Sequence, residues 1–168
     1  VIALFLAFSE TLGKSAQTEA LASNVEASNL WSFFQAKAIR ATTLRTASEQ
    51  METQAAGLQD AGAREAAEKR VADWKKTIAR YDDEPSTGEG RKQLAERAQH
   101  AEHARDLAMA KYHHFEVASA AFQIAIVLAS ATIITGMVAL AWLAGALALG
   151  GLAFSAIGFF APHAVHLF

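Results

Sequence analysis

The last 52 residues of the chain, 117–168, contain no Asp, Glu, Lys or Arg. A run of that length does not form the surface of a water-soluble domain, since such surfaces are rich in charged side chains. A bilayer core about 30 Å thick is crossed by a helix of about 20 apolar residues. The run therefore predicts membrane-spanning helices at 117–136 and 143–161, a tight turn at 137–142 and a tail at 162–168. The alternative is one buried hairpin of a soluble protein.

The chain also begins with an apolar run, VIALFLAF, which is too short to cross a bilayer by itself. We expect residues 1–13 to be the C-terminal part of a first transmembrane helix that starts before Val1. A remnant of a signal peptide is the alternative, although the run lacks a small-residue cleavage pattern. The expected protein crosses the membrane three times, with a polar segment between its first and second spans.

That polar segment, residues 14–116, holds all 15 Lys and Arg residues and is dense in strong helix formers. Helix breakers gather only at GLQDAG and EPSTGEG, which predicts helices at about 14–57, 63–83 and 91–116. The lengths of the second and third helices add up to about that of the first, at about 1.5 Å per residue. We therefore expect an all-α protein in which this segment forms an antiparallel helical-hairpin stalk.

Apolar residues in the stalk recur at alternating spacings of three and four, which is typical of coiled-coil-like packing. In the first helix the inward positions are predicted to be Phe34, Ala38, Ala41, Leu44, Ser48, Met51, Ala55 and Leu58, with one irregular three-residue step. In the second helix they are Ala67, Val71, Trp74, Ile78 and Tyr81. Trp74 is the largest packing residue of that stripe.

The stretch NLWSFFQAKAIR, residues 29–40, brings three aromatic rings into the first helix. Trp31 and Phe34 are expected to pack on the third helix near Ala95, Ala98 and Ala101. The apolar residues from position 30 to 34 cover about 160° of the helix, wider than the ~100° apolar face of an amphipathic helix. We therefore expect Phe33 to contact a second copy of the chain.

Small residues recur at spacings of four and three in the third membrane segment, among them Gly151 and Ser155. Such a stripe lets the backbones of membrane helices approach closely. We expect Gly151 and Ser155 to lie at a helix-packing or oligomer interface. Gln123, an amide inside the second span, is expected to hydrogen-bond a neighbouring helix.

Candidate chemistry is sparse. His100 and His103 are three residues apart on one helical face, a spacing that suits zinc or iron, but no Glu-x-x-His motif accompanies them. A solvated helix face is the preferred interpretation of the pair. TGEGRK lacks the spacing of a phosphate loop, and there is no cysteine. We expect no enzyme activity, no cofactor and, with a net charge of −2, no nucleic-acid partner.

Three blocks of the sequence together resemble a bacterial family catalogued as domain of unknown function 4337. The blocks are NVEASNLWSFFQAKAIR (24–40), ARYDDE (79–84) and HHFEVASAAFQIAIVLAS (113–130), and they occur in the order of the family pattern. Phe33 and Phe34 stand where the family usually has tyrosines. The resemblance implies a membrane protein with three spans and supplies no activity, substrate or catalytic residue.

These patterns favour a non-enzymatic, homo-oligomeric scaffold or assembly subunit of the bacterial inner membrane. Its expected partners are the lipid bilayer and further copies of itself, with a larger membrane complex as another candidate. One alternative is an oligomeric channel or transporter component; a second is a metal-binding protein that uses His100 and His103. Basic residues near the membrane ends, Lys14 and Lys111 among them, favour a cytoplasmic stalk.

Overall fold

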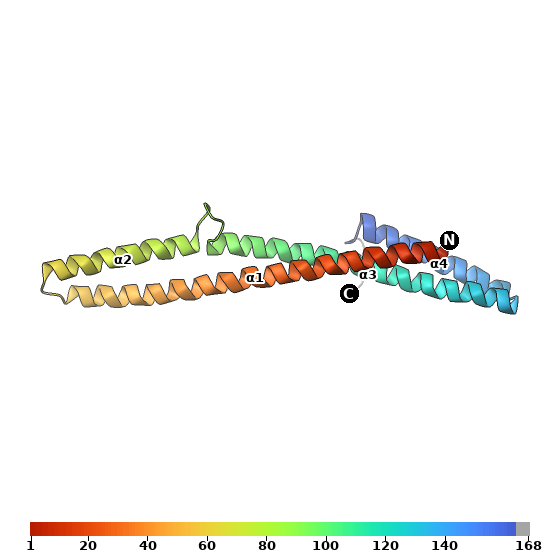
Figure 1. Ribbon diagram of the computed structural model, residues 1–168, viewed down its shortest axis with the longest axis horizontal. Coiled ribbons are helices and arrows are strands. Elements are labelled where there is room, and N and C mark those ends of the chain that lie inside the picture. Colours follow the sequence, from red (N-terminus) through yellow and green to blue (C-terminus); the bar gives the residue numbers. More distant parts are fainter. Residues whose placement is uncertain (164–168) are drawn as a thin grey trace. The chain divides into compact units, whose positions relative to one another are not determined.

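The computed structural model describes residues 1–163, and within them all regular structure is α-helical, which confirms the predicted all-α class. Figure 1 shows the four helices, α1 (Ile2–Ala56), α2 (Ala61–Asp82), α3 (Arg91–Thr135) and α4 (Val138–Phe160). The chain divides into two compact units. Unit 1 contains Val1–Asn24 and the chain from Glu102 onward, and unit 2 contains Val25–Ala101. Most of the predicted tail, 164–168, lies outside the described residues.

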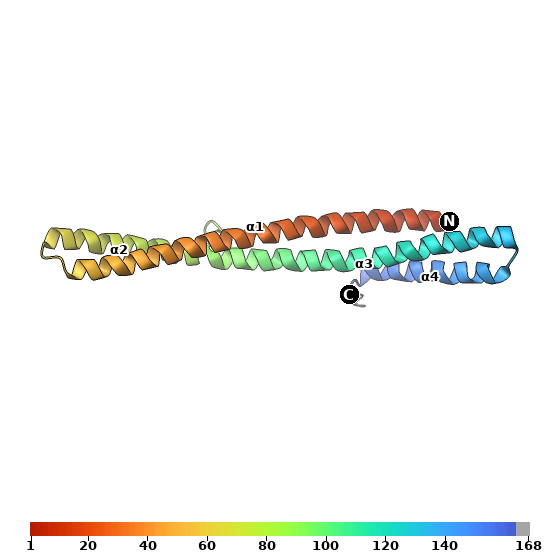
Figure 2. The same ribbon diagram turned by 90° about the horizontal axis from the view of Figure 1, so that it is seen from below.

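In unit 2, α2 lies beside α1 and runs in the opposite direction (Figures 1 and 2). The connection between them is short, and Asp60 caps the start of α2 by accepting a hydrogen bond from the N–H of Gly62 at 2.9 Å. Such a cap satisfies one of the N–H groups that a helix start leaves without a partner. The ion pair between Glu52 of α1 and Lys75 of α2 joins the two helices.

One face of α1 is buried along the whole of unit 2. The centre of this face is a row of buried or half-buried positions that alternate spacings of three and four: Ala27, Leu30, Phe34, Lys37, Ala41, Leu44, Ser48, Met51 and Ala55. Four residues beside this row are half-buried as well: Trp31, Ala36, Ala38 and Ala47. The sequence prediction differs at two places. Lys37 is buried while its predicted neighbour Ala38 is half-buried beside it, and Leu58 is exposed beyond the helix end. The five inward positions predicted for α2 are buried or half-buried.

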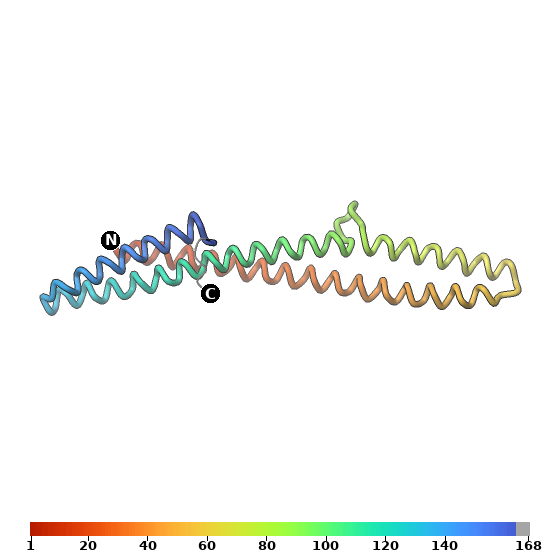
Figure 3. The backbone as a smooth tube through the Cα atoms, turned by 180° about the vertical axis from the view of Figure 1, so that it is seen from behind, coloured from red at the N-terminus to blue at the C-terminus, as the bar shows by residue number. Residues whose placement is uncertain are grey.

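In unit 1, α3 and α4 lie side by side and run in opposite directions, as Figures 2 and 3 show. The turn predicted at 137–142 is wrong, because α4 already begins at Val138. The sequence VALAW contains no helix breaker, so the helix extends through it. The break lies at Gly136, whose φ of +71° is the left-handed conformation in which many helices end.

Two helices, not the predicted three, contain a stretch long and apolar enough to cross a membrane: α3 and α4. Only 22% of the stretch in α3 and 17% of that in α4 is buried within the chain, unlike the core helices of a soluble protein. The predicted first span, residues 1–13, is not among them, because its apolar run of eight residues ends at Ser9 and Glu10. In the structure this run is the start of α1.

Candidate functional site

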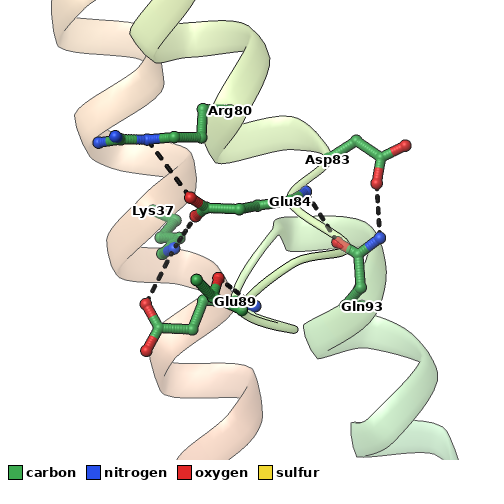
Figure 4. A network of polar contacts seen from close by, with 7 residues as sticks. Lys37, Arg80, Asp83, Glu84, Glu89 and Gln93 are labelled. Carbon is green, nitrogen blue, oxygen red and sulfur yellow. Dashed lines mark hydrogen bonds and ion pairs between the residues drawn. The ribbon is translucent and has the colours of Figure 1, made fainter.

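Lys37 of α1 has an exposed fraction of only 4%, which is unusual for a lysine. Its Nζ lies 3.8 Å from Oε2 of Glu84 and 3.6 Å from Oε2 of Glu89, both in the connection between α2 and α3 (Figure 4). The same Nζ lies 5.2 Å from the ring centre of Phe33 and 5.6 Å from that of Tyr81. The two carboxylates and two rings thus compensate for the hydration that the ammonium group of Lys37 loses on burial.

The connection itself is folded so that Glu84 faces Lys37 (Figure 4). The side-chain oxygen of Gln93 accepts a hydrogen bond from the backbone N–H of Glu84 at 3.1 Å, and its Nε2 donates to Asp83. A Cβ at Gly90 would collide with the backbone nitrogen of Glu84 and with Oε1 of Gln93, so this close approach needs glycine. We call Lys37, Glu84, Glu89 and Gln93 the Lys37 cluster.

Next to the Lys37 cluster lies the apolar core of unit 2. Leu30 of α1 and Leu94 and Ala98 of α3 form its buried centre. Trp31 and Phe34 pack against it, with their rings 5.4 Å apart in an edge-to-face arrangement. The expected packing of Trp31 and Phe34 on α3 is therefore found at Ala98, with Leu94 in the place given to the neighbouring Ala95.

Phe33 has a different environment from its two aromatic neighbours. It lies outside the buried centre and keeps an exposed fraction of 37%, with its ring under the ammonium group of Lys37. Phe34, in contrast, is half-buried and carries the guanidinium of Arg91 over its ring at 4.9 Å. Trp74 of α2, also predicted as an interface residue, is half-buried.

The structure brings together two of the three sequence blocks that were singled out. Lys37 comes from the first block, 24–40, and Tyr81 and Glu84 come from the second, 79–84. Sequence reasoning missed Lys37, because a charged residue is not counted in an apolar stripe. The signal was the single irregular step in the pattern of α1, which becomes regular when Lys37 replaces Ala38.

Unit 1 contains a groove between the first part of α1 and α3, with a cavity volume of ≈ 400 Å³. Its α1 side is lined by Ser9, Glu10, Gly13, Lys14 and Gln17, and its α3 side by Tyr112, Phe115, Glu116, Ser119, Ala120 and Gln123. Lining residues three and four positions apart identify one face of each helix. Within unit 1 we call this cavity the α1–α3 groove.

The two ends of the α1–α3 groove carry different polar contacts. At one end Tyr112 donates a hydrogen bond to Oε1 of Glu116 at 3.2 Å. The negative charge of Glu116 raises the pKa of Tyr112, and burial and this hydrogen bond raise it further. At the other end Nε2 of Gln123 donates to Oε1 of Glu10 at 3.2 Å, which agrees with the expectation that Gln123 bonds a neighbouring helix.

Small residues bring α4 against the other two segments of unit 1. A Cβ at Gly151 would lie 2.8 Å from the ring of Phe122 on α3, so the ring packs directly on the backbone. Oγ of Ser155 lies 2.9 Å from Oγ of Ser9 on α1, within hydrogen-bonding distance. Gly151 and Ser155 therefore lie at helix contacts within one chain, and any role between chains is a separate prediction.

The remaining candidates do not gather into a site. His100 and His103 are both exposed on α3. Within residues 1–163, no group of three or more His, Cys, Asp or Glu side chains is arranged so that it could hold a metal ion. His114, another histidine of α3, is buried in unit 1, where its Nε2 lies 3.1 Å from the backbone oxygen of Pro162.

Comparison with known proteins places this arrangement in a family. No curated protein and no solved structure matches the chain. The family model described as Domain of unknown function (DUF4337) matches residues 1–161. The matched residues include all three blocks on which the resemblance was based, the Lys37 cluster and the α1–α3 groove. The chain belongs to the DUF4337 family.

Proposed function

We propose that the protein is a non-enzymatic, homo-oligomeric scaffold or assembly subunit of the bacterial inner membrane. In this proposal α3 and α4 cross the bilayer, the start of α1 packs along them, and unit 2 belongs to an antiparallel helical-hairpin stalk. The observation that carries the proposal is the exposure of Phe33 beside an aromatic core that is otherwise packed within the chain.

Contacts within unit 1 support a membrane position for residues 1–13. The ring of Phe5 stacks on that of Phe122 with centroids 6.2 Å apart, and Glu10 accepts its hydrogen bond from Gln123. Phe122 and Gln123 belong to the apolar stretch of α3. If that stretch lies in the bilayer, the beginning of α1 packed along it shares its depth.

Ion pairs within unit 2 support the hairpin. Glu52 near the end of α1 pairs with Lys75, and Lys37 earlier in α1 pairs with Glu84 later in the chain. The partner in α1 lies earlier in the chain, Lys37 instead of Glu52, when the other partner lies later, Glu84 instead of Lys75. This order is expected when two neighbouring segments run antiparallel.

Exposure of Phe33 supports self-association. A phenylalanine in contact with water forgoes part of the stabilisation that its burial gives, on the order of 1.5–3 kcal/mol. Its neighbours Trp31 and Phe34 pack against the core that Leu94 and Ala98 of α3 help to form, and Phe33 is not part of that packing. A second copy of the chain is the proposed cover for its ring.

Native mass spectrometry of the detergent-solubilised full chain tests this proposal. The wild-type chain is expected to give one defined subunit number, and Phe33→Gln is expected to lower it. Ile39→Gln is the matched control, because Ile39 is an exposed apolar residue on the same helix. Circular dichroism checks that both variants keep their helix content. A monomeric wild-type chain, or a subunit number that Phe33→Gln leaves unchanged, would refute self-association through this ring.

A channel or transporter component is the second candidate, and the α1–α3 groove favours it. The groove combines carboxylates, an amide and hydroxyls beside an apolar helix stretch, and polar groups at such positions often mark transport pathways. Ion flux into liposomes that contain the purified chain would support this candidate. Flux that the Gly151→Leu variant retains in full would argue against a path along these helices.

A further inference from the structure

We infer that a groove between the start of α1 and α4 binds one phospholipid whose headgroup carries a phosphate and a primary amine. The inference rests on the proposed membrane position of unit 1. It goes beyond the scaffold role, because it names a ligand that this role does not require.

Two cavities meet in this groove. Their volumes are ≈ 310 Å³ and ≈ 270 Å³, and both are lined by Leu12 of α1, Phe115 of α3 and Phe159 of α4. Because the two cavities share one residue from each of three helices, they are adjoining parts of a single space. Within unit 1 we call this space the α1–α4 groove.

The larger cavity is apolar. Apart from Ser9 and Ser155, every residue that lines it is hydrophobic, Phe8 and Phe159 among them. The hydroxyls of the two serines lie 2.9 Å apart, so each has the other as a hydrogen-bond partner and needs none from a ligand. The side chains of Phe8 and Phe159 are 66% and 63% exposed. An open groove with such walls suits an apolar ligand, and in a bilayer that ligand is an acyl chain.

The smaller cavity carries one charge of each sign. It is lined by Lys111 of α3 and by Ser15 and Glu19 of α1. Lys111 is half-buried, and the ion pairs among residues 1–163 include neither Lys111 nor Glu19. An ammonium group and a hydroxyl can donate to phosphate, and a carboxylate accepts from an amine. A headgroup with both groups matches this lining, whereas a purely anionic headgroup would bring its charge close to Glu19.

The charged cavity lies at the end of the groove where a lipid headgroup belongs. On α1 the apolar cavity begins at Phe5, whose ring stacks on Phe122 in the apolar stretch of α3, and the charged cavity ends at Glu19. Lys111 lies six positions before that stretch, which starts at residue 117. This is about 9 Å at about 1.5 Å per residue. Long lysine side chains near the ends of membrane helices extend to the headgroup layer.

Native mass spectrometry of the full chain in detergent, with phospholipids added, tests the inference. Equal amounts of phosphatidylethanolamine, phosphatidylglycerol and phosphatidylcholine are offered together. We expect phosphatidylethanolamine to be retained most strongly. Phosphatidylglycerol has the phosphate without an amine, and the quaternary ammonium group of phosphatidylcholine has no N–H to donate to Glu19.

Three variants test the charged end. Lys111→Gln should lower the retention of phosphatidylethanolamine about tenfold, as expected for the loss of one hydrogen bond between charged groups, and Lys111→Arg should keep it. Glu19→Gln should raise the retention of phosphatidylglycerol to that of phosphatidylethanolamine. Lys14→Gln is the matched control, because Lys14 lines the other groove of unit 1. Circular dichroism checks that all of these variants keep their helix content.

A further variant tests the apolar end. Ala156 lines the apolar cavity, so Ala156→Trp should fill it and lower the retention of all three lipids. Ala153→Trp is the control, because Ala153 is exposed on the same helix and lines neither cavity. Unchanged retention in Ala156→Trp would show that no acyl chain occupies the groove and would refute the inference.

The outcomes separate this inference from the proposed function. Equal retention of the three lipids by the wild-type chain, or retention that Lys111→Gln leaves unchanged, would refute the lipid site, while the subunit number in the same spectra still tests self-association. A monomeric chain that retains phosphatidylethanolamine through Lys111 would support the lipid site and refute the oligomeric scaffold. Extraction of the chain from membranes by alkaline carbonate would overturn the membrane position and the lipid site together.

Discussion

The helices of unit 2 and those of unit 1 are held together by different kinds of side-chain contact. In unit 2 long charged side chains reach across the helices, as Lys37 does to Glu84 and Glu89. In unit 1 the helices approach closely because the residues at their contacts are small. Phe122 packs directly on the backbone at Gly151, and the hydroxyls of Ser9 and Ser155 lie within hydrogen-bonding distance.

The difference follows from the surroundings in which each unit is proposed to work. In water, burying apolar area drives helices together, and a buried charge is tolerated when carboxylates and rings surround it. In a bilayer the lipid is as apolar as the side chains, so close backbone approach and hydrogen bonds between helices take over. Three measurements test this difference between the two units.

The largest effect is expected at Lys37. Lys37→Met removes the cation between Glu84 and Glu89. It leaves the mostly buried Glu84 with one cation, the exposed Arg80, whose Nε lies 3.6 Å from Oε1 of Glu84. Breaking a buried ion pair by removing one partner costs about 3–5 kcal/mol, and we expect a value near the lower limit here. Hydrogen exchange of backbone amides in residues 80–95 should accelerate by a corresponding factor, while the amides of unit 1 should be unchanged.

Two variants control that experiment. Lys75→Met removes an ion pair of the same type from an exposed position, since the Lys75 side chain is 61% exposed, and should cost less than about 1 kcal/mol. Lys37→Met combined with Glu84→Gln removes both charges and should recover part of the loss. Equal exchange in the wild type and Lys37→Met would show that the Lys37 cluster does not hold unit 2 together.

A smaller effect is expected at Gly151. Gly151→Val places methyl groups where the ring of Phe122 now lies, and overpacking of this kind costs about 1–3 kcal/mol. The thermal unfolding temperature in detergent should fall, with faster amide exchange in α4. Gly150→Val is the control, because a Cβ at Gly150 meets no atom within 4 Å. If both variants unfold alike, close approach is not what holds α4 in place.

The smallest effect concerns Tyr112. The pKa of its phenol lies above the usual 10.0, chiefly because of the charge of Glu116, so Glu116→Gln should lower it. Absorbance at alkaline pH measures this in a Tyr81→Phe background, where Tyr112 is the tyrosine that titrates. Glu96→Gln, on an exposed part of α3, is the control.

The direction of the pH dependence follows from that shift. Because the folded-state pKa is raised, the contribution of Tyr112 to stability is fully present below pH 10.0 and is lost as the pH rises through the folded-state pKa. Glu116→Gln should weaken this alkaline loss. An unchanged titration in that variant would mean that Glu116 does not act on the phenol.

Much of the helix pattern could be predicted from the sequence. Breakers at GLQDAG and EPSTGEG are where α1, α2 and α3 are separated, and the rings of Trp31 and Phe34 lie on α3 as expected. These features depend on local propensity and on one-dimensional periodicity, which a single sequence displays directly.

The polar contacts could not be predicted in the same way. The approach of Glu89 to Lys37 depends on the path of a loop, and the pairing of Glu10 with Gln123 joins residues 113 positions apart. Neither depends on a repeat in the sequence. The end of the second span at 136 was predicted and agrees with the break at Gly136, whereas the start of α4 at Val138 was placed too late, because the length rule for a span does not locate the first residue of a helix.

The contact between His114 and Pro162 has a practical consequence for determining which way the protein faces. Pro162 follows α4, and its backbone oxygen lies beside the helical turn of α3 that carries Glu116, the last charge of the chain. If α3 and α4 cross a bilayer as proposed, Pro162 and Glu116 lie on the same side of it, and a fluorescent or enzymatic reporter inserted directly after Pro162 should be found on that side. Its signal would tell directly whether that charged end of α3 faces the cytoplasm.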